Sequence, residues 1–120
     1  MIKSYRDFEV YQRAYKISLE IHMLSLKFPK IEQYGGLADQ LRRATKSISM
    51  NIAEGYGKHS SSALEFKRYL SISLGSKNEV DVQLQYCKDL SYITADEYSK
   101  YYNEYQEIGK MLYTLIQVWK

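Results

Sequence analysis

The stretch LADQLRRATKSISMNIAEG, residues 37–55, decides the fold of this chain. Its apolar residues recur at intervals of four and three, at Leu37, Leu41, Ala44, Ile48 and Ile52. Residues with this spacing share one face of an α-helix, because the helix turns once in about 3.6 residues. The stretch therefore predicts an amphipathic helix at about residues 37–54 that buries one face in a core.

Two further helices are predicted after this stretch, each beginning with a capping box. Ser62 stands three residues before Glu65, at the start of a helix predicted at residues 62–90. Thr94 stands three residues before Glu97, at the start of a helix predicted at residues 95–118. In the last helix large side chains recur every seven residues, which is typical of helices that pack in bundles.

The segment before the stretch, residues 5–27, predicts a helix with a very wide apolar arc. Its charged and amide side chains fall on one stripe about 100° wide, and almost everything else is apolar or small. Phe28-Pro29 ends this helix, because proline disfavours the α conformation of the residue before it. The arc is wider than one small bundle can bury, which predicts contact with another copy and hence a homo-oligomer.

These four helices, joined by short loops, predict an all-α fold, an antiparallel up-down four-helix bundle. The length of 120 residues predicts a single domain at residues 1–120. With 45% hydrophobic and 26% charged residues, the composition excludes an intrinsically disordered chain. One proline and six glycines leave few of the turn signals that a β-sandwich needs.

The sequence also predicts a cytoplasmic protein. Its single cysteine, Cys87, cannot form an intramolecular disulfide, and the start MIKSYRDFEV lacks the apolar region of a signal peptide. No uncharged apolar run approaches the roughly 20 residues that cross a bilayer, so no membrane segment is expected.

The charge is uneven along the chain, although the total is only +3. Residues 40–77 hold seven Lys and Arg against two Glu, whereas residues 78–120 are acidic. Such asymmetry is typical of a surface for phosphates or for an acidic partner, and it is also what ordinary solubility requires. The candidate nucleic-acid-binding residues are Arg42, Arg43, Lys46, Lys58, Lys67 and Arg68.

Two of these assignments have structural alternatives. Arg42 and Arg43 could instead bridge to Glu79 or Asp81 of a neighbouring helix or subunit. The loop at residues 55–61 could hold a phosphate through its backbone and Lys58, but it lacks the Walker pattern, and a glycine C-cap at Gly55 followed by a flexible connector is the favoured explanation.

Catalysis and metal binding have little support in the sequence. His22 and His59 are the only histidines, and neither stands near a partnered nucleophile or a set of residues at metal-ligand spacing. Thirteen tyrosines could stack bases, but the five in the last helix lie among acidic residues that repel phosphate. We assign those tyrosines to the core and to subunit contacts, and we expect no enzyme, no metal and no cofactor.

Several motifs carry a family resemblance. The run from Leu41 to Gly55 reads LRRA, then SI, then NIAEG, and resembles the QLRRA…SIPxNIAEG signature of the four-helix-bundle proteins encoded in intervening sequences of bacterial large-subunit ribosomal RNA genes. Similar matches are FEVYQRA at residues 8–14, FPxxExYG at residues 28–35, EFxxYL at residues 65–70 and GSxxExxxQL at residues 75–84. The resemblance covers roughly residues 8–116. Two positions depart from it: Ser49 replaces the usual proline, which predicts a straighter helix, and Gly36 is an extra residue.

The resemblance implies a homo-oligomer, typically a ring of five, with a suspected role in nucleic-acid binding and no catalytic residues. A related branch, the accessory variability proteins of diversity-generating retroelements, is similar and has a reverse transcriptase as its partner. Within the shared motifs we expect structural roles for Asn51, Glu54, Gly55, Gly75 and Ser76. Asn51 is expected to tie two helices together, and Gly75-Ser76 to allow close helix approach.

The leading functional prediction is a non-enzymatic homo-oligomeric helical module that binds RNA or DNA through its basic central segment. The alternative is an adaptor whose same basic surface docks a nucleic-acid-handling partner protein. Binding of naked nucleic acid that weakens steeply with salt would favour the first prediction. Co-purification of a stoichiometric protein partner would favour the second.

Overall fold

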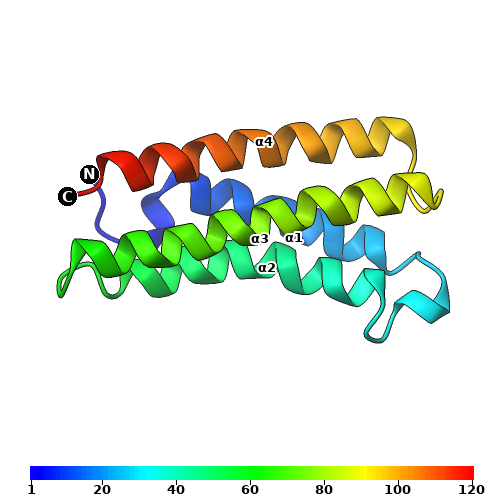
Figure 1. Ribbon diagram of the computed structural model, residues 1–120, viewed down its shortest axis with the longest axis horizontal. Coiled ribbons are helices and arrows are strands. Elements are labelled where there is room, and N and C mark those ends of the chain that lie inside the picture. Colours follow the sequence, from blue (N-terminus) through cyan, green and yellow to red (C-terminus); the bar gives the residue numbers. More distant parts are fainter.

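The computed structural model describes residues 1–120 and contains four α-helices and no β-strand (Figure 1). The helices are α1 (Glu9–Ser25), α2 (Leu37–Tyr56), α3 (Ala63–Asp89) and α4 (Ala95–Val118). Two short 3₁₀ helices, η1 (Tyr5–Asp7) and η2 (Lys30–Glu32), precede and follow α1. The predicted all-α class with four helices is confirmed.

The first helix begins later than the expected residue 5, because a separate turn precedes it. The Asp7 carboxylate accepts hydrogen bonds from the backbone N–H groups of Lys3 and Ser4, at 2.7 and 2.9 Å, and these bonds hold the pKa of Asp7 below its usual value. Phe8 is then extended, with φ −72° and ψ 125°, which separates η1 from α1. The capping box at Ser4 and Asp7 thus closes one turn of 3₁₀ helix rather than starting α1.

The helices lie side by side along the 44 Å axis of the molecule, and the chain reverses direction from each helix to the next (Figure 1). Side-chain contacts agree with this reversal. Phe8, just before α1, packs on Tyr56 at the end of α2, and Ser25, at the end of α1, contacts Arg42 near the start of α2. As a result both chain termini and the α2–α3 connection gather at one end, which we call the α2–α3 end. η2 and the α3–α4 turn lie at the other end.

The core runs between the helices and takes residues from all four. On α2 the predicted stripe is buried: Leu41, Ile48 and Ile52 are fully enclosed. Burial of a side chain of this size stabilises the fold by about 1.5–3 kcal/mol. Their partners on the other helices include Ile17, Ile21, Phe66, Leu70, Val80, Leu84, Tyr105, Ile108 and Leu112.

Gly55 does not end α2, so its predicted role as a C-cap is wrong. The helix continues to Tyr56, and Gly57 follows as the cap. Gly55 is buried, and a Cβ atom there would overlap the Cβ of Tyr69 on α3. A glycine is therefore required because α2 and α3 approach closely at this point.

The expected close approach at Gly75-Ser76 applies to only one of the two residues. The Ser76 hydroxyl lies 2.8 Å from the Ser47 hydroxyl of α2, a short distance that brings the two helices together. No atom lies within 4 Å of the position that a Cβ would take at Gly75, which is exposed. Within the chain nothing offsets the roughly 1 kcal/mol that a mid-helix glycine costs relative to alanine.

None of the helices combines the length and the apolar character that a bilayer crossing requires.

Ser49 keeps α2 continuous where a proline would have removed a backbone donor, and its hydroxyl donates to the carbonyl of Lys46 at 3.2 Å.

A candidate nucleic-acid interface

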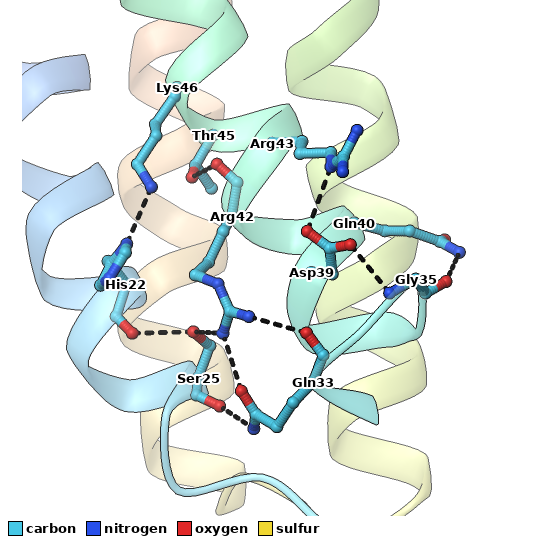
Figure 2. A network of polar contacts seen from close by, with 10 residues as sticks. All are labelled: His22, Ser25, Gln33, Gly35, Asp39, Gln40, Arg42, Arg43, Thr45 and Lys46. Carbon is cyan, nitrogen blue, oxygen red and sulfur yellow. Dashed lines mark hydrogen bonds and ion pairs between the residues drawn. The ribbon is translucent and has the colours of Figure 1, made fainter. Parts of the chain in front are cut away.

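The first basic residue of α2, Arg42, is half-buried, and its side chain points toward Ser25 and Gln33 (Figure 2). Its guanidinium donates to the Ser25 hydroxyl at 2.8 Å, and to the side-chain and backbone oxygens of Gln33, both at 3.1 Å. Gln33 in turn donates to the backbone carbonyls of Ser25 and Phe28. Arg42 therefore ties α2 to the end of α1 and to the segment around η2, and this network leaves few of its donors for a ligand.

Arg43, the next residue, faces outward. Its side chain is 80% exposed and pairs with Asp39 one turn earlier on the same helix, at 3.1 Å. Neither Arg42 nor Arg43 bridges to Glu79 or Asp81, which corrects that alternative within one copy of the chain. An exposed pair of this kind contributes little to stability, so Arg43 can exchange Asp39 for a phosphate at small cost.

Lys46 is shared between α2 and α1. Its ammonium nitrogen lies 2.8 Å from Nδ1 of His22 (Figure 2). Burial, followed by the charges of Lys46 and Arg42, lowers the pKa of His22, which favours a neutral imidazole that accepts the hydrogen bond from Lys46. Lys46 thus has one donor committed to the protein and retains others for solvent.

The second group of predicted residues lies together at the α2–α3 end, where Lys58, Lys67 and Arg68 form what we call the loop cluster. Lys58 and Arg68 both lie over the Tyr69 ring, at 5.9 and 4.8 Å from its centroid. Arg68 also makes a two-point contact with Glu65 at 3.0 and 3.1 Å, which lowers the pKa of that carboxyl. Lys58 and Lys67 form no ion pair within the chain.

The same end carries features that the sequence analysis missed. His59 stacks on Tyr56 with the ring centroids 4.2 Å apart, and Trp119 at the end of α4 packs edge-on against both. Both chain termini lie at this end (Figure 1), and the terminal segments carry the basic residues Lys3, Arg6 and Lys120 in the sequence. The predicted up-down topology was the available signal, because it places both termini beside the α2–α3 loop.

Two residues of the family-like motifs, Asn51 and Glu54, differ in the contacts that they make. Asn51 donates to the backbone carbonyl and the hydroxyl of Ser47, at 2.8 and 3.0 Å, and Ser47 contacts Ser76, so the amide supports the α2–α3 contact through Ser47. Glu54, for which a structural role was expected, is exposed and forms no hydrogen bond with the loop that follows. No three His, Cys, Asp or Glu side chains come together in a way that could hold a metal ion.

Lys77 of α3 is not among the predicted site residues, and it is only 7% exposed. Its ammonium pairs with Asp81 at 2.9 Å, and Gln106 of α4 donates to the other oxygen of Asp81 at 3.1 Å. A Cβ at Gly109 would lie 2.7 Å from Cε of Lys77, so the lysine stem occupies the space that this glycine leaves. The basic character of α3 is therefore partly internal.

Comparisons with known proteins agree on one family. The model of the 23S rRNA-intervening sequence protein family matches residues 6–114. A crystal structure of a protein of unknown function from the S23 ribosomal protein family, from Bacteroides thetaiotaomicron, superimposes with a TM-score of 0.80 at 26% identity. The match covers 91% of this chain and 96% of that chain. A search of curated proteins finds no significant match. The chain belongs to the 23S rRNA-intervening sequence protein family.

Proposed function

We propose that this protein is a non-enzymatic module that binds RNA or DNA by its phosphate backbone, and that it acts as a cytoplasmic homo-oligomer of antiparallel four-helix bundles. The loop cluster is the centre of the binding surface. Arg43 and Lys46 extend that surface along α2, while Arg42 holds the scaffold. The family resemblance adds the expectation of a ring of five copies.

The observation that carries this proposal is the presence of three exposed or half-exposed cations at one end of the bundle, two of which have no acidic partner. Cations without partners remain available to phosphates, whereas paired ones must first give up their carboxylates. The α3 N-terminus lies at the same end, and its backbone N–H groups add a partial positive charge.

An adaptor that docks an acidic protein remains the alternative, because a basic surface flanked by Tyr69, Tyr56 and Trp119 has the composition of a protein interface as well. The two functions differ in whether the purified protein binds nucleic acid without a partner protein. A nucleic-acid module binds naked RNA or DNA by itself, and an adaptor binds only in the presence of its partner.

The test is a triple substitution, Lys58→Gln, Lys67→Gln and Arg68→Gln, with binding to a fluorescent RNA and a duplex DNA measured as salt is varied. The matched control is Lys88→Gln, Lys100→Gln and Lys110→Gln, which removes the same charge from the far part of α3 and from α4. We expect the test variant to lose affinity and to show a flatter salt dependence, because fewer counterions are released. Equal losses in the two variants would indicate a net-charge effect and contradict the proposed site.

A further inference from the structure

The outward face of α1 carries an apolar stripe that nothing in the chain covers. Tyr15, Leu19, Met23 and Leu26 are 50, 51, 64 and 52% exposed. At 100° per residue they lie within about 80° of one another, on the side of α1 opposite its buried residues. A continuous stripe of large apolar side chains on a helix is typical of a contact surface.

A groove of about 480 Å³ lies on another side of the bundle, between α2 and α3. Leu37, Val82 and Tyr86 supply its apolar lining, and Gly75 leaves one end of it open. Gln83 also lines it, and its side-chain oxygen is buried without a donor in this chain. A mid-helix glycine with empty space above it and an unsatisfied amide oxygen beside it are both explained if another helix occupies the groove.

The stripe and the groove overlap in height along the bundle. His22 of α1 contacts Lys46, and Ser76 of α3 contacts the adjacent residue Ser47, so His22 and Ser76 are level. α1 and α3 run in the same direction and advance equally per residue (Figure 1). Residues 21–26 of α1, which include Met23 and Leu26 of the stripe, therefore lie level with residues 75–80 of α3, the half of the groove that begins at Gly75.

Matching heights are what a rotation axis parallel to the bundle requires, because such a rotation moves each point without changing its height. Both surfaces also border α2: His22, which adjoins the α1 stripe, contacts Lys46 of α2, and Leu37 of α2 belongs to the groove. The direction from one copy to the neighbour at its stripe and the direction to the neighbour at its groove therefore form an angle smaller than 180° on the α2 side. Successive copies then turn in one sense and close into a ring rather than a straight filament.

Charge at the edges of the two surfaces is complementary. Lys27 follows the stripe and is exposed, and by the same reckoning it lies level with residue 81. Glu79 lines the groove close to that height and forms no ion pair within the chain. The opposite charges would meet when one surface is placed on the other.

From these observations we propose that the α1 stripe of one copy seats in the Gly75 groove of the next copy, as a head-to-tail interface. This inference rests on the homo-oligomer of the proposed function and adds the two faces that form it. The occupant of the groove is a second copy of this chain, since the chain itself provides a matching surface at the matching height.

The experiment uses two variants that each disable one face. Gly75→Gln fills the groove, and because glutamine favours the helix more than glycine does, the single copy stays folded. Leu19→Gln combined with Met23→Gln makes the exposed stripe polar without touching the core. Ser99→Gln, at an exposed position of α4, is the matched control.

Light scattering on each protein at micromolar concentration gives the first result, with circular dichroism to check helix content. We expect an oligomer for the native sequence and for Ser99→Gln, and a monomer for each face variant. An equimolar mixture of the two face variants should form a dimer and nothing larger, because the mixture contains one intact stripe and one intact groove per pair.

Other outcomes overturn the assignment in distinguishable ways. If the native chain is a monomer, both the oligomer of the proposed function and this interface are wrong. If the native chain is an oligomer that either face variant preserves, only the choice of faces is wrong. If both variants are monomers whose mixture forms no dimer, the stripe and the groove do not pair with each other.

Discussion

At the scale of single residues, Arg42 and Arg43 are neighbours in sequence with different environments. Arg42 makes three hydrogen bonds to Ser25 and Gln33, whereas Arg43 has one exposed ion pair. Loss of hydrogen bonds from a charged, partly buried group costs about 1–3 kcal/mol, and loss of an exposed pair costs about 0–1 kcal/mol. Arg42→Gln should therefore lower the free energy of unfolding by about 1–3 kcal/mol in urea denaturation.

Arg43→Gln is the matched control for this prediction, because it removes the same charge one residue away. Its free energy of unfolding should stay within about 1 kcal/mol of the native value. Equal effects of the two substitutions would show that the network around Arg42 contributes nothing specific.

Gly55 allows a second prediction at this scale. A methyl group at residue 55 would overlap Tyr69 and crowd Phe66, both of which are fixed by the α2–α3 packing. Overpacking of this kind typically costs about 1–3 kcal/mol, more than the helix propensity that alanine gains over glycine. Gly55→Ala should lower the melting temperature, and an unchanged or raised melting temperature would show that α2 and α3 separate freely here.

These residues also show what could be predicted from the sequence. The stripe from Leu37 to Ile52 predicted which face of α2 is buried, because helical period alone determines it. The partners of Arg42 could not be predicted, since Ser25 and Gln33 meet only when the η2 segment folds back beside α2. Gly55 was predicted to be a C-cap because a glycine near a helix end can either end the helix or allow another helix to approach closely. Only the position of Tyr69 distinguishes these two roles.

At the scale of elements, the His22–Lys46 contact links α1 to α2 and makes their packing sensitive to pH. The pKa of His22 is lowered in the folded protein, so below about pH 6.5, the ordinary histidine value, the unfolded chain binds more protons than the folded one. The free energy of unfolding should therefore fall as pH decreases from about 7 through 6.5 toward the folded pKa of His22.

His22→Gln is the control, because a glutamine oxygen can accept from Lys46 without titrating. The variant should lose the part of the pH dependence that lies between pH 7 and 5, while His59 is present in both proteins. The carboxylates of Glu32 and Asp39, whose pKa values backbone N–H groups lower, act in a separate window. Their stabilisation is present above about pH 4 and is lost as pH falls further. Identical pH profiles above pH 5 would contradict the role of His22.

Some helix boundaries are determined by local sequence signals, and others depend on the tertiary structure. α2, α3 and α4 lie within two residues of their expected ranges, because capping residues and the apolar period are local signals. α1 is shorter than expected at both ends, since the Ser4–Asp7 turn takes its first residues. The capping box was visible in the sequence, but its closure around a single turn depends on the extended conformation of Phe8.

At the scale of the whole molecule, the chain topology concentrates charge. Residues 40–77 are basic in the sequence, yet the fold separates them: Arg42 and Lys77 are engaged internally, and the loop cluster lies at one end beside the termini. Copies related by an axis parallel to the bundle would point their α2–α3 ends the same way. The loop clusters of a ring would then share one basic face.

The salt dependence of binding tests that arrangement, because for duplex DNA each phosphate contact steepens the slope of log affinity against log salt by about 0.9. One copy offers five cations on the proposed surface, three in the loop cluster together with Arg43 and Lys46, so the proposed monomeric variant Gly75→Gln should show a slope no steeper than about −4.5. If the native chain forms the proposed ring, its slope on a long duplex should be clearly steeper, since several clusters contact the same backbone. On a duplex of about 10 base pairs, which spans roughly 34 Å, the two slopes should converge as fewer clusters are reached at once. Equal slopes on the long duplex would mean that the clusters of different copies do not lie on a common face.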